Sequence, residues 1–85
     1  MTDFDKRHTC WRELITERMR WNMDSWSNVI SCTISDLELD RRFDATHGKE
    51  EGVPFTLWTW DWVYFSHEYD GADLCLCVRR NPEEK

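Results

Sequence analysis

The chain contains four cysteines and three histidines, residue types that bind zinc or supply a nucleophile and its base. Structural zinc sites usually take cysteines separated by about two to four residues. Only Cys75 and Cys77 lie close together, with a single residue between them, and the other two cysteines are remote in the sequence. We therefore expect no metal and no cofactor, and we interpret the cysteines as buried thiols.

A cysteine nucleophile would need a base within reach, and His67 is the nearest histidine to Cys75 and Cys77. In the hairpin register predicted below, His67 points to the face opposite both cysteines. The sequence also contains no Gly-rich phosphate loop, no HExxH motif and no GxSxG motif. These observations predict that the chain is not an enzyme.

Aromatic residues are the most distinctive feature, with six Trp, four Phe and two Tyr in 85 residues. Four of them alternate along one segment: Trp58, Trp60, Trp62 and Tyr64. Residues that share one face of a strand are about 6.6 Å apart, so this spacing predicts a continuous aromatic ridge, with Arg79 across from Trp62. We expect the ridge to form the apolar centre of a partner-binding surface. The alternative is that other tryptophans fold over it as a second small core.

Acidic residues give the chain a net charge of -6 and a sequence pI near 4.9. Asp36, Glu38 and Asp40 alternate, so on a strand their carboxylates would be about 6.6 Å apart. Carboxylates at this spacing can imitate a phosphate backbone and steer a basic protein partner. The alternative is a solvated face that keeps the protein soluble. The same net charge disfavours direct nucleic-acid binding.

Three elements must position these residues. Helical spacing of Phe4, Trp11, Ile15 and Met19 predicts a helix over residues 2–22, with Thr2 and Asp5 as its capping box. From Trp26 the apolar period becomes two, which predicts a strand. The apolar parity then slips near Ser35 and Asp36, which indicates a β-bulge or a bend.

The third element is a hairpin from Pro54 to Arg80 with its turn at Asp70-Gly71. This turn pairs Tyr69 with Ala72 and aligns apolar with apolar residues upstream. One face then carries an aliphatic set: Phe55, Leu57, Val63, Phe65, Leu74, Leu76 and Val78. We expect the helix to cover this set and to leave the Trp face partly open. The alternative is the inverted packing, with the helix on the Trp face.

Together these elements predict one α+β domain over residues 1–85. An N-terminal helix would pack on a three- or four-stranded antiparallel sheet spanning about residues 26–80, with a frayed tail at 81–85. The N-terminus has no apolar signal region, and no apolar run approaches the ~20 residues that cross a bilayer. We therefore expect a cytoplasmic protein without membrane contact.

In size, acidity and lack of catalytic motifs the chain resembles small phage-encoded inhibitors, such as anti-CRISPR proteins. The resemblance is one of general character and transfers no site residue. It implies a non-catalytic inhibitor or adaptor that occupies a basic, nucleic-acid-handling partner surface. The alternative is a structural subunit that self-associates as a homodimer through its Trp-rich sheet face.

Overall fold

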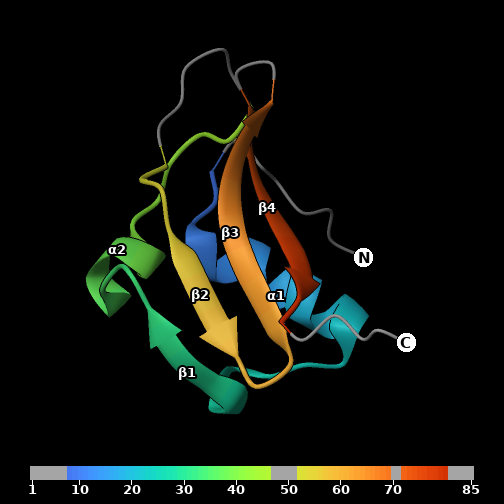
Figure 1. The fold of residues 1–85 in the computed structure, drawn as a ribbon. Coiled ribbons are helices and arrows are strands. Elements are labelled where there is room, and N and C mark those ends of the chain that lie inside the picture. Colours follow the sequence, from blue (N-terminus) through green and yellow to red (C-terminus); the bar gives the residue numbers. More distant parts are fainter. Residues whose placement is uncertain (1–7, 47–51, 70–71, 81–85) are drawn as a thin grey trace.

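A computed structural model describes residues 8–46, 52–69 and 72–80. Four antiparallel strands form one sheet in the order β1-β2-β3-β4 (Figure 1), which confirms the α+β class. In chain order the elements are α1 (Trp11–Asn22), the 3-10 turn η1 (Trp26–Asn28), β1 (Val29–Cys32), α2 (Asp36–Asp40), β2 (Thr56–Thr59), β3 (Trp62–Tyr69) and β4 (Ala72–Arg79).

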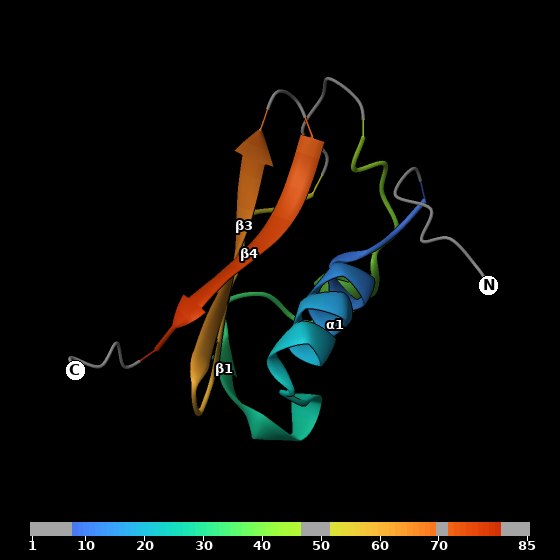
Figure 2. The same ribbon diagram turned by 90° about the vertical axis from the view of Figure 1, so that its right-hand side faces the viewer.

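The elements form two layers, with α1 lying across one face of the sheet (Figure 2). We call this side of the sheet the helix face. Within the described ranges, no helix or strand lies on the opposite side (Figures 1 and 2). No helix in the same ranges has the length and apolar character needed to cross a membrane.

Helix α1 begins later than the sequence predicts. Thr9 is held in an extended bridge to Phe43 by two backbone hydrogen bonds of 3.0 and 2.8 Å, so residues 8–10 are not helical. The predicted capping box at residues 2–5 lies outside the described residues. At its other end, α1 stops where Met23 adopts a left-handed conformation with φ 56°, as helix C-termini commonly do.

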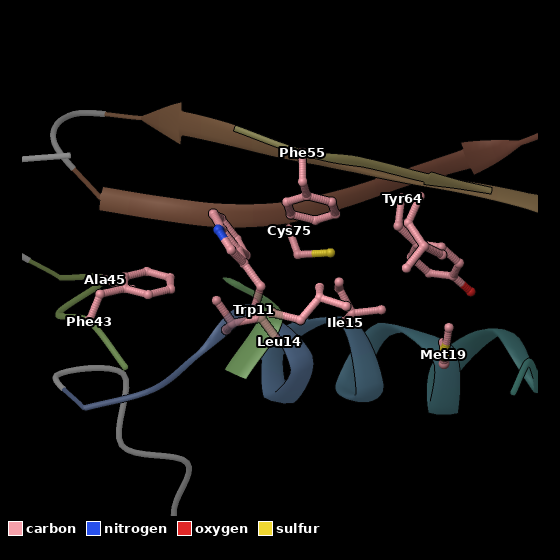
Figure 3. Close-up of a cluster of buried hydrophobic side chains, with 11 residues drawn as sticks. Trp11, Leu14, Ile15, Met19, Phe43, Ala45, Phe55, Tyr64 and Cys75 are labelled. Atoms are coloured by element: carbon pink, nitrogen blue, oxygen red, sulfur yellow. The ribbon is translucent and has the colours of Figure 1, made fainter. Parts of the chain in front are cut away.

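The core lies between α1 and the helix face (Figure 3). The predicted stripe of Trp11, Ile15 and Met19 is buried there, as is Leu14. The Trp11 ring packs against the rings of Phe43 and Phe55, with centroids 5.1 and 4.7 Å away. This packing requires glycine at position 52, because a Cβ there would lie 2.7 Å from Trp11 Cζ2.

The predicted register of the β3–β4 hairpin is confirmed. Tyr69 pairs with Ala72, Phe65 with Leu76, and Trp62 with Arg79. The outer edge of β4 is partly occupied: the Asp73 N–H donates to the Ala45 carbonyl at 3.0 Å, and Arg18 Nε donates to the Cys75 carbonyl at 2.9 Å.

The predicted orientation of the sheet is wrong, because α1 covers the face that contains Tyr64 and Cys75. Val63, Phe65, Leu74, Leu76 and Val78 lie on the other side. The physical reason is the polar end of α1. Its Asn22 and the following Asp24 hydrogen-bond the Tyr64 hydroxyl at 3.2 and 2.8 Å, so the tyrosine is buried with its polar group satisfied.

The segment after η1 also differs from the predicted strand with a β-bulge or a bend near Ser35 and Asp36. The irregularity in pairing lies between Val29 and Ser31 and not near residue 35. The change of apolar parity at Ser35 marks the start of helix α2 instead, where the Ser35 hydroxyl accepts a 3.2 Å hydrogen bond from the Glu38 N–H.

Candidate protein-binding face

The uncovered side of the sheet is the candidate functional site, and we call it the open face. The pairing registers of all four strands define its members. They are Ser31, Thr56, Trp58, Val63, Phe65, His67, Tyr69, Ala72, Leu74, Leu76 and Val78.

The centre of the open face is apolar and in contact with solvent. Phe65 and Leu76 form a cross-strand pair, and Val63 and Val78 form the next such pair along the hairpin. The first three of these side chains are half-buried, whereas Val78 is 51% exposed. None of the four belongs to the core cluster beneath the sheet. Beside Phe65 the surface is hollowed between Thr33, Pro54 and Thr56.

No open-face position carries a carboxylate. The acidic residues of the described sheet strands are Glu68 and Asp73, which form a cross-strand pair on the helix face. Helices α1 and α2 carry further acidic side chains: Glu13, Glu17, Asp36, Glu38 and Asp40. The carboxylates of the described helices and strands therefore lie on the side of the sheet opposite the open face.

The predicted aromatic ridge does not exist. Trp58 lies on the open face, Trp60 lies in the turn between β2 and β3 and is 65% exposed, and Trp62 lies on the helix face. Tyr64, the fourth predicted member, is fully buried under α1. The four residues occur at every second position of the sequence, but they do not share one face of the sheet. The reason is that the chain reverses direction at Trp60 and Asp61.

Several hydrogen bonds hold this reversal. Thr59 Oγ1 accepts from the Trp62 N–H at 3.1 Å and donates to Asp24 at 2.7 Å. The Arg80 N–H donates to the Asp61 carbonyl at 2.9 Å, and Arg80 Nη1 lies 3.4 Å from the carbonyls of Thr59 and Trp60. A two-residue turn pairs the residues that flank it, so Thr59 and Trp62 share a face although one number is odd and the other even.

Arg79 lies across from Trp62 as predicted, but on the helix-face side. Its guanidinium stands over the Trp62 ring at 5.1 Å from the centroid, in a cation–π contact. Trp62 is partly buried against the core cluster. Arg79 and Trp62 therefore lie at the edge of the helix face and are not part of the open face.

The polar network around Tyr64 has a structural role. Burial raises the pKa of the Tyr64 hydroxyl above its usual range, so it remains a neutral hydrogen-bond donor. Burial works against ionisation of Asp24, but hydrogen bonds from Asn28, Thr59 and Tyr64 outweigh it and lower the pKa of Asp24. The ionised carboxylate therefore ties the end of α1 to the sheet.

The predicted acidic strip is wrong in geometry, because Asp36, Glu38 and Asp40 lie on α2 and not on a strand. Arg12 on α1 pairs with both Asp36 and Asp40, and its guanidinium also stands 4.9 Å from the Trp26 ring centroid. Two of the three carboxylates are thus partly neutralised within the protein and do not have the even spacing of a phosphate backbone.

The cysteines and histidines do not assemble a reactive pair in the described residues. Cys75 and Cys77 lie on the helix face, whereas His67 lies on the open face, as the register predicts. Burial raises the pKa of the Cys75 thiol to about 12, which suppresses its thiolate. Within the described ranges, no group of three or more His, Cys, Asp or Glu side chains is arranged to hold a metal ion.

No family model matches this chain, and no curated protein or solved structure matches it either. The open face is therefore the feature of the molecule that bears on its function. The predicted aliphatic set is divided by the structure. Phe55 and Leu57 are buried in the core as predicted, whereas the other five members lie on the open face: Val63, Phe65, Leu74, Leu76 and Val78. The sequence does contain a signal that α1 covers the other face. Asn22 and Asp24, at the end of α1, can hydrogen-bond a buried tyrosine hydroxyl, and Tyr64 lies on that face.

Proposed function

We propose that this chain is a non-catalytic protein-binding protein whose contact surface is the open face. One observation carries the proposal: an apolar surface without carboxylates extends over β2, β3 and β4, and no described element covers it. Contiguous apolar surface of this kind is rare on monomeric proteins and usually marks an interaction site.

The side chains of the open face suit contact and not chemistry. Phe65 and Trp58 are of the aromatic types concentrated in interfaces. His67, the one titratable imidazole on this face, is separated by the sheet from both neighbouring thiols. The protonated state of Cys75 at neutral pH also argues against a thiolate nucleophile.

Within this proposal the role is that of an inhibitor or adaptor. The resemblance to phage-encoded inhibitors and the basic partner both remain predictions. The apolar contact surface in this proposal is the open face, which contains Trp58 but not the other predicted ridge residues, Trp60, Trp62 and Tyr64. Glu13, Glu17 and Glu38 lie on the α1 and α2 side of the molecule, outside this contact surface, and would steer a basic partner only at long range.

Site-specific photo-crosslinking in the source cell tests the proposal. A benzophenone amino acid replaces Phe65 on the open face in one variant and Glu17 on the exposed side of α1 in the control. We expect covalent protein adducts from position 65 well above those from position 17, and mass spectrometry identifies what is attached. Equal or absent adduct formation at the two positions, with both variants folded, would contradict the proposal.

A further inference from the structure

We infer that the open face binds the open face of a second copy of this chain, which gives a two-fold symmetric dimer with two sheets packed face to face. This inference rests on the proposed function, because it assigns a partner to the same surface. It is argued from charge, shape and area.

Charge favours a second copy over a basic partner at this surface. A basic protein placed on the open face would bury its cations against a surface that has no carboxylate to pair with them, which is unfavourable. A second open face is equally free of acidic groups. It offers the same kind of apolar side chain, so burial on both sides is favourable.

The acidic side chains of the helices do not oppose this arrangement. The carboxylates of α1 and α2 lie on the far side of each sheet. Stacked layers are about 10 Å apart, so the two α1 layers of such a dimer are separated by about 30 Å. That distance exceeds the Debye length of roughly 8 Å at physiological salt, and repulsion between the acidic sides is therefore screened.

Shape also fits an isologous contact, in which one surface must be complementary to itself. The open face has an exposed side chain at Val78, and a shallow hollow borders it beside Phe65. Sheets that pack in the aligned manner cross at roughly 30° and interdigitate their inner side chains. The central Phe65–Leu76 pair lies in the middle of the hairpin, where side chains from a second sheet would be most completely buried.

Area determines how strong such a dimer is. Eight-residue strands are about 26 Å long, and four strands are roughly 19 Å wide. Because β1 and β2 have only four residues each, the footprint is about 400 Å² in projection. A standard interface buries about 800 Å² of accessible surface per partner. We therefore expect a reversible dimer that forms in the micromolar range or above.

Sedimentation equilibrium from about 1 µM to about 300 µM tests the inference. The wild type should change from a 10.4 kDa monomer to twice that mass as concentration rises. Leu76→Glu places a carboxylate in the centre of the open face and should keep the protein monomeric. Leu37→Glu is the matched control, because it makes the same change at a residue of α2 that is 82% exposed, and it should dimerise like the wild type.

A second variant guards against misfolding, because Leu76 is half-buried. Val78→Glu changes a more exposed side chain of the same face, and it should also prevent dimerisation while near-ultraviolet circular dichroism stays native. A wild type that is monomeric at every concentration would overturn the inference, as would a dimer that survives both open-face changes.

The outcomes for the two proposals are distinguishable. If the wild type is monomeric but position 65 crosslinks to a different protein, the second copy is excluded and the protein-binding proposal stands. If the wild type is monomeric and position 65 gives no adduct, both fail.

Discussion

The two faces of the sheet are both apolar, yet only one is buried under α1. The helix face contains hydroxyl groups that the end of α1 can satisfy: Tyr64 and Thr59 both hydrogen-bond Asp24. Among the described residues, no buried side-chain nitrogen or oxygen lacks a hydrogen-bond partner. The open face is also apolar over β3 and β4, and its hydroxyl groups at Thr56 and Ser31 form no hydrogen bond to a helix within the described residues. Polar groups and their hydrogen-bond partners, as well as apolar area, therefore help to determine which face of a sheet with two apolar faces becomes the core.

The sharpest test of this comparison uses the same substitution on each face. Leu57→Ala removes a fully buried side chain beneath α1 and should lower the free energy of unfolding by about 3 kcal/mol. Leu76→Ala removes a half-buried side chain from the open face and should cost about 1 kcal/mol. Urea denaturation at low micromolar concentration measures both, and equal losses would contradict the assignment of the faces.

Removing the tyrosine hydroxyl tests the polar contribution. Tyr64→Phe leaves Asp24 and Asn22 without their shared partner and should cost about 1–2 kcal/mol. Tyr69→Phe is the control, since Tyr69 is exposed at the end of the open face, and it should leave stability within about 0.5 kcal/mol of the wild type. Thermal unfolding of the two variants gives the difference, and a neutral Tyr64→Phe would remove the proposed reason for the orientation.

Acid should weaken the same network. The pKa of Asp24 is lower in the folded protein than its ordinary value of 3.8. The stabilising contribution is therefore fully present well above pH 3.8 and is lost as the pH falls through that value and then through the lower folded pKa. Asp24→Asn should flatten the acid end of the stability profile relative to the wild type. Asp61→Asn, which removes an exposed carboxylate in the turn, is the matched control. Parallel profiles for Asp24→Asn and the wild type would contradict this role.

The smallest effect is expected on the acidic side of the molecule. Asp40→Asn removes an exposed ion pair with Arg12 and should cost about 0.5 kcal/mol at low salt and less at high salt. Glu38→Gln makes the same change of charge on α2 without breaking that pair, and it should be neutral within error. If Asp40→Asn had no effect at low salt, Asp36 and Asp40 would not be neutralised by Arg12 as described.

The sequence was sufficient to predict the fold class, the register of the β3–β4 hairpin and the buried stripe of α1. The register depends on the Asp-Gly signal at residues 70–71, and the stripe depends on the spacing of Trp11, Ile15 and Met19. Both signals are local, and together they indicate the fold class. The faces could not be predicted in the same way. Their assignment depends on a turn at Trp60-Asp61 that has no strong sequence signal, and on hydrogen bonds between Tyr64 and residues about 40 positions away.

Helix α2 was missed for a related reason. The alternation of Asp36, Glu38 and Asp40 is typical of a strand, and a five-residue helix is too short to show a helical period. The capping serine at position 35 was the available local signal. The same short segment then places Asp36 and Asp40 within reach of Arg12, a contact that no local pattern predicts.

The occupied edge of β4 limits how the protein can assemble. Arg18 and Ala45 bond to the backbone of the first half of this strand, so another chain cannot add to the sheet along that stretch. Such strand-by-strand growth is open-ended and leads to fibres, whereas contact through a face related by two-fold symmetry is complete once two copies have met. The fold thus protects a protein with a large apolar surface from polymerisation at this edge, while leaving that surface available for a closed assembly.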